Sequence, residues 1–65
     1  MLILIADDQP KVRLGLRVLL ERQAGFVIVG EVEDTKSLLA QTRALLPDLV
    51  LLSWELPGLR ADDTL

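Results

Sequence analysis

Carboxylates and a hydroxyl directly follow two short apolar runs of this chain. Asp7 and Asp8 close the run Leu2–Ala6, and Ser53 closes a second run that extends from Asp48 to Leu52. If the two runs are neighbouring parallel strands, their carboxyl ends meet at one edge of a sheet, where such sheets bind ligands. Two carboxylates at that edge predict an acidic pocket suited to a divalent cation.

Plainer interpretations stand beside this one. Asp7 and Asp8 could be solvated residues that only end a strand, because acidic clusters are often structural. Ser53 could be a nucleophile or a phosphorylated serine, but the chain has no histidine to activate it, which leaves a neighbouring aspartate as the base. We favour a Ser53 that satisfies local hydrogen bonds, and a Trp54 that packs against a loop or a partner.

The spacing of apolar residues predicts one strand and one helix before residue 26. The run Leu2–Ala6 is short and ends abruptly, as a buried strand does. Pro10 suits the first turn of a helix over residues 11–22, and Gly25 is a suitable stop for it. The spacing gives this helix a solvated face of Arg13, Arg17 and Glu21 and an inner face of Val12, Leu16, Leu19 and Leu20, supplemented by Leu14 and Val18.

The remainder of the chain predicts two more strands and a second helix. Residues 26–32 are rich in β-branched side chains, and their polar members suit the edge of a sheet. Asp34 and Thr35 can cap a helix that Pro47 ends, and Leu49–Leu52 is a third strand. A turn at Pro57-Gly58 and the beginning of a third helix at residues 60–65 follow. The inner stripe of the second helix is Leu38, Leu39, Thr42, Leu45 and Leu46.

The predicted order β-α-β-α-β indicates an α/β fold with a parallel sheet and right-handed crossovers. Sixty-five residues allow one small domain of marginal stability, and the absence of cysteine excludes disulfides. The net charge of −3, without a basic cluster, argues against nucleic-acid binding by this segment. No apolar run is long enough to cross a membrane and no secretion signal is recognisable, so we expect a cytoplasmic protein without membrane contact.

Four segments together resemble the receiver domain of response regulators in two-component signalling. They are residues 2–8, 12–20, 47–53 and 56–58, and the resemblance is closest to receivers that precede helix-turn-helix output domains. It covers the whole chain, so residues 1–65 would form a partial domain, the first half of a receiver. The resemblance implies a truncated flavodoxin-like fold with strand order 2-1-3 and the start of a third helix.

The resemblance also implies roles for the residues at the strand ends. Asp7 and Asp8 would hold Mg²⁺ together with the backbone carbonyl of Glu55, and Ser53 would occupy the phosphoacceptor position. In the family, a carboxylate at that position attacks a phosphohistidine of a histidine kinase. Ser53 cannot form the acyl phosphate and removes one charge from the metal site, so we expect weak Mg²⁺ binding.

A strand order of 2-1-3 would place the third strand at an edge of the sheet. The fourth and fifth strands of the family, with its switch hydroxyl and phosphate-binding lysine, would lie beyond residue 65. An apolar edge invites another chain to pair with it, so we expect a homodimer or association with another receiver. The edge comprises Leu49, Val50, Leu51 and Leu52.

These observations leave three hypotheses. The first is a truncated receiver module that is not an enzyme, is not phosphorylated at position 53 and acts through protein association. The second is a Mg²⁺-dependent, phosphoryl-accepting receiver from a DNA-binding transcriptional regulator, with its missing half supplied in trans. The third, a nucleotide-binding fragment, ranks last because no glycine-rich loop follows the first strand.

Overall fold

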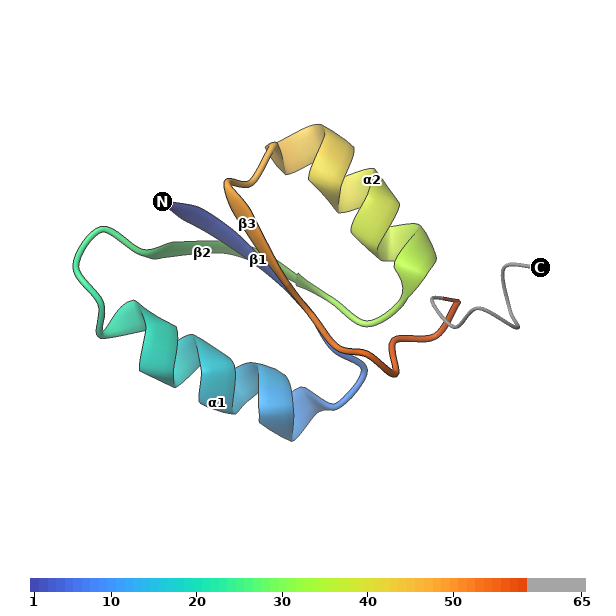
Figure 1. Cartoon of the computed structure of the whole chain (residues 1–65), viewed down its shortest axis with the longest axis horizontal. Coiled ribbons are helices and arrows are strands. Elements are labelled where there is room, and N and C mark those ends of the chain that lie inside the picture. Colours follow the sequence, from blue (N-terminus) through green and yellow to red (C-terminus); the bar gives the residue numbers. More distant parts are fainter. Residues whose placement is uncertain (59–65) are drawn as a thin grey trace.

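The computed structural model describes residues 1–58, which form a parallel sheet of three strands between two helices (Figure 1). The strand order is β2-β1-β3, and α1 and α2 lie on opposite sides of the sheet. This confirms the predicted fold class and strand order, whereas the third helix predicted at residues 60–65 lies outside the described residues. The elements are β1 (Leu2–Ala6), α1 (Pro10–Glu21), β2 (Val27–Val32), α2 (Thr35–Leu45) and β3 (Leu49–Leu52).

Strand β1 is the centre of the core. It pairs with a strand on each side, and its residues from Ile3 to Ala6 are fully buried. Because successive side chains of a strand point to opposite faces, Ile3 and Ile5 face α1 while Leu4 and Ala6 face α2. The cluster on the α2 face comprises Leu4, Ala6, Val32 and Leu56, with Leu38, Leu45 and Val50 packed against it.

A bulge in β2 sets which of its side chains face α1. Ile3 pairs with Ile28, but Leu4 pairs with Gly30, so one residue of β2 is skipped. A Cβ on Gly30 would lie only 3.1 Å from Cδ1 of Leu4, which explains the glycine at this close approach. Beyond the bulge, Glu31 pairs with Ile5 and therefore faces α1.

Helix α1 covers less of the sheet than its sequence predicts. Leu16 and Leu20 of the predicted inner face are half-buried, but four other members of that set are exposed. Helix α1 contacts β1 and β2 but not β3, whereas α2 contributes to the same apolar cluster as Val50 of β3. The helix ends at Glu21, before the predicted stop, and Gly25 instead adopts a positive φ in the turn to β2. The exposed apolar residues are Val12, Leu14, Val18 and Leu19.

Helix α2 has well-defined ends. The Asp34 side chain accepts a hydrogen bond of 2.7 Å from the backbone N–H of Ser37, as the sequence predicts for an N-cap. This bond lowers the pKa of Asp34, with a smaller contribution from the charge of Lys36. Leu46 is the C-cap in a left-handed conformation and is exposed, as is Leu39, although both were expected in the inner stripe. Neither α1 nor α2 is long and apolar enough to cross a membrane.

Candidate functional site

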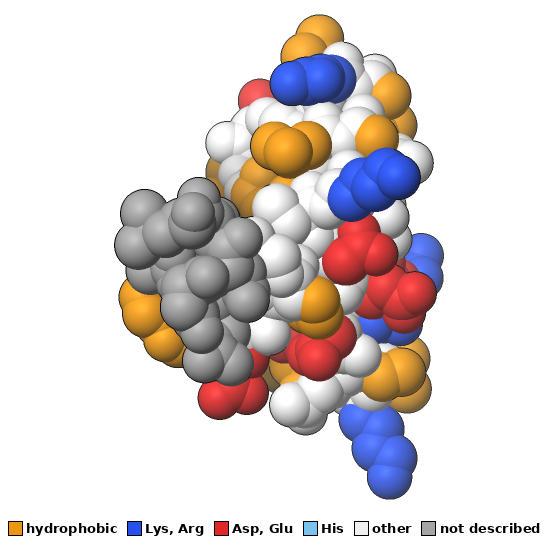
Figure 2. Space-filling view, turned by 90° about the vertical axis from the view of Figure 1, so that its right-hand side faces the viewer, with side chains coloured by type: hydrophobic (Ala, Val, Ile, Leu, Met, Phe, Trp, Pro, Cys, Tyr) orange, Lys and Arg blue, Asp and Glu red, His pale blue; other side chains and the backbone are white. Residues whose placement is uncertain are grey.

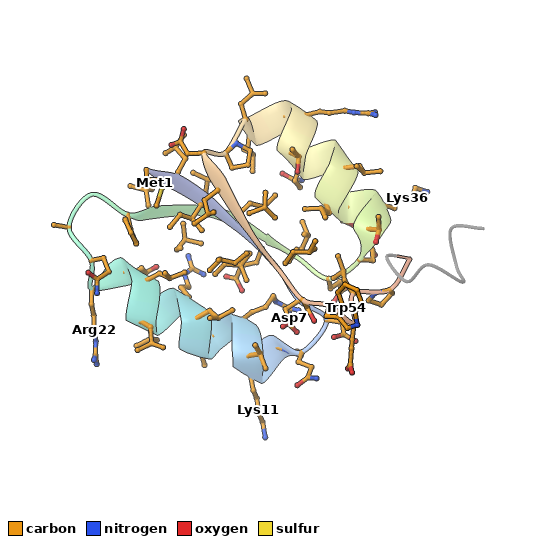
Figure 3. The ribbon with its side chains drawn as sticks, viewed as in Figure 1. Met1, Asp7, Lys11, Arg22, Lys36 and Trp54 are labelled. Atoms are coloured by element: carbon orange, nitrogen blue, oxygen red, sulfur yellow. The ribbon has the colours of Figure 1, made fainter. Side chains whose placement is uncertain are left out.

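The carboxyl ends of β1 and β3 lie side by side. Ala6 pairs with Leu52, and the backbone N–H of Ser53 donates to the carbonyl of Ala6 at 2.8 Å. The residues that follow, Asp7 and Ser53, therefore adjoin at this edge of the sheet. Figure 3 shows Asp7 and Trp54 at the same end of the sheet, near the beginning of α1.

Asp7 is held at three of its atoms. Its backbone N–H donates to Val32 at 3.0 Å, its Oδ1 accepts from the N–H of Gln9 at 2.8 Å, and its carbonyl accepts from Nη1 of Arg13 at 2.6 Å. The residue is buried. Its second carboxylate oxygen, Oδ2, accepts no hydrogen bond within residues 1–58, so a charged oxygen in a fixed position remains for a ligand.

The other predicted ligands lie in more open positions. Asp8 and Glu55 are exposed, and Ser53 is half-buried. The Ser53 hydroxyl accepts a hydrogen bond of 3.3 Å from the N–H of Glu55, and the Ser53 carbonyl accepts one of 3.2 Å from Leu56. These bonds form a tight turn, so the serine oxygen takes part in shaping the loop that carries the Glu55 carbonyl.

The loop after Ser53 is anchored to the beginning of α2. Leu56 is fully buried in the core, and the carbonyl of Pro57 accepts from both the N–H and the hydroxyl of Thr35, at 3.0 and 2.7 Å. Gly58 has a φ of 87°, and a Cβ on it would lie 3.1 Å from the Thr35 side chain. The sequence predicts the turn at Pro57-Gly58, but it does not reveal its attachment to Thr35.

The charged face of α1 is not simply solvated, contrary to the expectation for Arg13 and Arg17. The Arg13 side chain is only 17% exposed, and its Nε lies 3.4 Å from Oε1 of Glu31. Arg17 contacts the other Glu31 oxygen at 2.7 Å and Glu21 at 2.9 Å. The hydrogen bond that Arg17 donates to Glu21, together with the charge of Glu31, raises the pKa of Arg17. The helical spacing groups the arginines, but only the bulge in β2 brings Glu31 to them.

The face on which the strands end carries both acidic and basic side chains (Figure 2). Figure 2 views the molecule from this side and shows Asp and Glu side chains gathered between Lys and Arg side chains. A cavity of about 480 Å³ opens at the β2 edge, where it is shared by both helices. Asp7, Asp8 and Ser53 do not line it, although two of its lining residues hydrogen-bond the backbone of Asp7. Its lining residues are Arg13, Glu31, Val32, Glu33, Ser37 and Gln41.

The predicted cation ligands are all hard oxygen atoms. No group of three or more His, Cys, Asp or Glu residues that could hold a metal occurs within residues 1–58. The predicted set contains only two carboxylates, from Asp7 and Asp8, and adds a backbone carbonyl from Glu55. Carboxylate and carbonyl oxygens are ligands that Mg²⁺ accepts, usually with several waters. The donor atoms therefore fit Mg²⁺ in kind, with one carboxylate fewer than an aspartate at position 53 would provide.

Comparison with known proteins identifies the family of the chain. Residues 3–63 match the response regulator receiver domain. The chain belongs to this family. Receiver domains generally bind Mg²⁺ at their phosphorylation site. The assignment of Asp7 and Ser53 to that site stays a prediction.

Relatives of this receiver domain are regulators of transcription. It is 44% identical over 85% of its length to a transcriptional regulator of Pseudomonas aeruginosa, of which it covers 26%. It is 33% identical over 97% of its length to the nitrate/nitrite response regulator NarL of Escherichia coli, of which it covers 29%. The transcription regulator BvgA of Bordetella pertussis is 39% identical over 88% of the chain, which covers 27% of BvgA. The chain thus spans little more than a quarter of these relatives, and no solved structure matches it.

Proposed function

We propose that this receiver domain signals through protein association and does not accept a phosphoryl group at position 53. The observation that carries the proposal is Ser53 at the end of β3, beside Asp7, where its hydroxyl accepts a hydrogen bond within its own loop. An acyl phosphate requires a carboxylate nucleophile, which serine lacks. The domain is then a cytoplasmic signalling module and not an enzyme.

Strand β3 is the surface proposed for association. Within residues 1–58 it pairs only with β1, so its other edge has no strand partner, and neither helix covers it. Leu49 and Leu52 are both exposed at this strand. An uncovered apolar edge favours addition of another strand. A second copy can pair there about a two-fold axis, because a two-fold interface uses the same surface of both chains.

Molar mass in solution tests the association. Size exclusion with light scattering is expected to give twice the 7.2 kDa of one chain, with and without millimolar Mg²⁺. Leu52→Lys places a charge on the proposed edge and is expected to give a monomer. Leu14→Lys adds the same charge on exposed α1 and should leave the dimer intact. A folded wild-type monomer would refute the proposed dimer.

Intact mass after incubation with Mg²⁺ and acetyl phosphate tests the chemistry at position 53. We expect no phosphate adduct, because the serine offers no carboxylate and the chain has no histidine to activate it. Ser53→Ala is the matched control. A wild-type adduct that disappears in Ser53→Ala would contradict the proposal, whereas an adduct present in both proteins would lie elsewhere on the chain.

The retained acidic pair favours a second candidate, a Mg²⁺-dependent receiver completed in trans, from a DNA-binding transcriptional regulator. Asp7 is buried and fixed, which a vestigial solvated aspartate would not require. Asp7, Asp8 and the Glu55 carbonyl would hold Mg²⁺, which offsets charge on a transferring phosphoryl group. A histidine kinase would then be the donor. The relatives that regulate transcription support such a parent protein.

A further inference from the structure

Arg13 connects the acidic strand end to the outer strand of the sheet. It originates on α1, yet its Nη1 donates to the carbonyl of Asp7 at 2.6 Å, the end of β1. Its Nε lies 3.4 Å from Glu31 on β2, and its side chain is largely shielded from water. A planar guanidinium offers several donors in fixed directions, so one side chain can hold both acceptors at once.

The hydrogen bond to the Asp7 carbonyl constrains both aspartates. That carbonyl belongs to the peptide that joins Asp7 to Asp8, and a peptide unit is planar. A hydrogen bond that fixes this oxygen therefore fixes the orientation of the peptide plane, and with it the direction of the chain from Asp7 to Asp8. The Gln9 N–H already holds one carboxylate oxygen of Asp7. Arg13 thus restricts the backbone position of Asp8, which the contact between Gln9 and the Asp7 carboxylate leaves free.

The charges around Arg13 cancel. Arg13 and Arg17 contribute two positive charges, and Glu21 and Glu31 contribute two negative charges within the same set of ion pairs. An unpaired guanidinium beside two aspartates would oppose a cation. Because Glu31 contacts both arginines, it compensates the charge that Arg13 brings and holds the side chain in place.

We infer that Arg13 is a positioning residue that orients Asp7 and Asp8 toward a divalent cation, while Glu31 cancels its charge. Neither side chain touches the cation. The inference rests on the proposed assignment of the two aspartates as Mg²⁺ ligands, but it depends neither on phosphorylation nor on the dimer.

The sign of one mutational effect separates positioning from simple charge. If Arg13 acts only as a nearby positive charge, Arg13→Ala removes a repulsion and Mg²⁺ binds more tightly. If Arg13 positions the aspartates, Arg13→Ala weakens binding, and we expect about a tenfold loss, as for other groups that orient metal ligands. Isothermal titration of the folded proteins with MgCl₂ measures the difference.

Three further variants test the same role of Arg13 by Mg²⁺ titration. Arg13→Lys keeps the charge but offers no planar donor pair, so we expect affinity to remain below wild type. Glu31→Gln removes the carboxylate that compensates Arg13, whereas Arg17 keeps its ion pair with Glu21. This variant should also weaken Mg²⁺ binding, although Glu31 is not a predicted ligand. Lys11→Ala is the matched control, because Lys11 lies on the same helix and points away from the sheet in Figure 3. It should bind Mg²⁺ at least as well as wild type.

The outcomes are decisive in both directions. Weaker binding by Arg13→Ala and Glu31→Gln, with Lys11→Ala unaffected and far-UV circular dichroism unchanged, supports the inference. Equal or tighter binding by Arg13→Ala overturns the inference. A wild-type chain that gives no heat of binding, from a 10-fold molar excess of Mg²⁺ up to about 10 mM, also overturns it, because this concentration is well above that at which such sites fill. If Arg13→Ala does not fold, Arg13→Lys and Glu31→Gln carry the same comparison. A phosphate adduct or a monomeric mass would instead contradict only the proposed function.

Discussion

The two faces of the sheet are held by different forces. On the α2 face, buried apolar side chains from β1 and β2 and the half-buried Val50 of β3 meet Leu56 of the loop after β3. On the α1 face, Arg13 and Arg17 form ion pairs with Glu31 of β2, and two leucines and two valines of α1 remain exposed to water. The shared strand β1 is buried on both faces, so the difference comes from the elements that cover it.

This difference separates stability from site geometry. The apolar α2 face removes more hydrocarbon from water and should carry most of the free energy of folding. Ion pairs that remain partly exposed contribute little to that free energy, but they have directional geometry. The α1 face therefore fixes the backbone of Asp7, whereas the α2 face anchors the loop that carries Ser53.

Truncating Leu56 should produce the largest effect on this contrast. Leu56→Ala removes a fully buried side chain from the α2 face, and large-to-small changes in a core cost about 2–5 kcal/mol. Leu14→Ala on α1, where the side chain is 62% exposed, should stay within about 0.5 kcal/mol of wild type. Urea denaturation followed by far-UV circular dichroism measures both. Similar losses in the two variants would show that α1 packs as tightly as α2.

Two glycine substitutions should act in opposite directions. Gly58→Ala places a Cβ at positive φ and 3.1 Å from Thr35, so we expect a loss of about 1–2 kcal/mol. Gly15→Ala in the middle of α1 meets no atom within 4 Å and should stabilise the domain by about 0.5–1 kcal/mol through helix propensity. Thermal unfolding of both variants measures the difference. A destabilised Gly15→Ala would mean that α1 lies closer to a neighbour than the structure places it.

The smallest expected effect is the pH dependence of the α2 cap. The Ser37 N–H lowers the pKa of Asp34 in the folded chain below the ordinary value of 3.8. The stabilisation is therefore present above that value and is lost as pH falls through the lower folded pKa. Asp34→Asn keeps a good N-cap but cannot titrate, so its stability should fall less between pH 5 and more acidic solution, about pH 2. Parallel acid-induced losses in both proteins would exclude Asp34 as a contributor.

Residue spacing was sufficient to predict the order of elements and the neighbouring strand ends. The aspartates after β1 and the serine after β3 could be placed at one edge because parallel strands end on the same side. The N-cap Asp34 and the turn at Pro57-Gly58 were also predictable, since both depend on local backbone geometry. The Asp7–Ser53 neighbourhood therefore needed only local signals and the sheet topology.

Contacts that depend on exact register could not be predicted. The bulge after Ile28 determines that Glu31 faces α1, and no residue type in this strand predicts the bulge. Without the bulge, Arg13 and Arg17 look like an ordinary solvated pair. The exposed leucines of α1 were misassigned because helical spacing identifies an apolar face but not how much of it a small sheet can cover. The Thr35–Pro57 contact likewise joins residues 22 apart and has no local signal.

Trp54 has an optical consequence. It is the only tryptophan, the chain has no tyrosine, and its side chain is 88% exposed beside the end of β3. An indole already surrounded by water changes its environment little when the chain unfolds, so its emission maximum should barely report denaturation. The same indole would shift its emission to shorter wavelength if another molecule covered it. The intrinsic fluorescence of this protein should thus be a poor gauge of folding and a sensitive gauge of contact at the loop after β3.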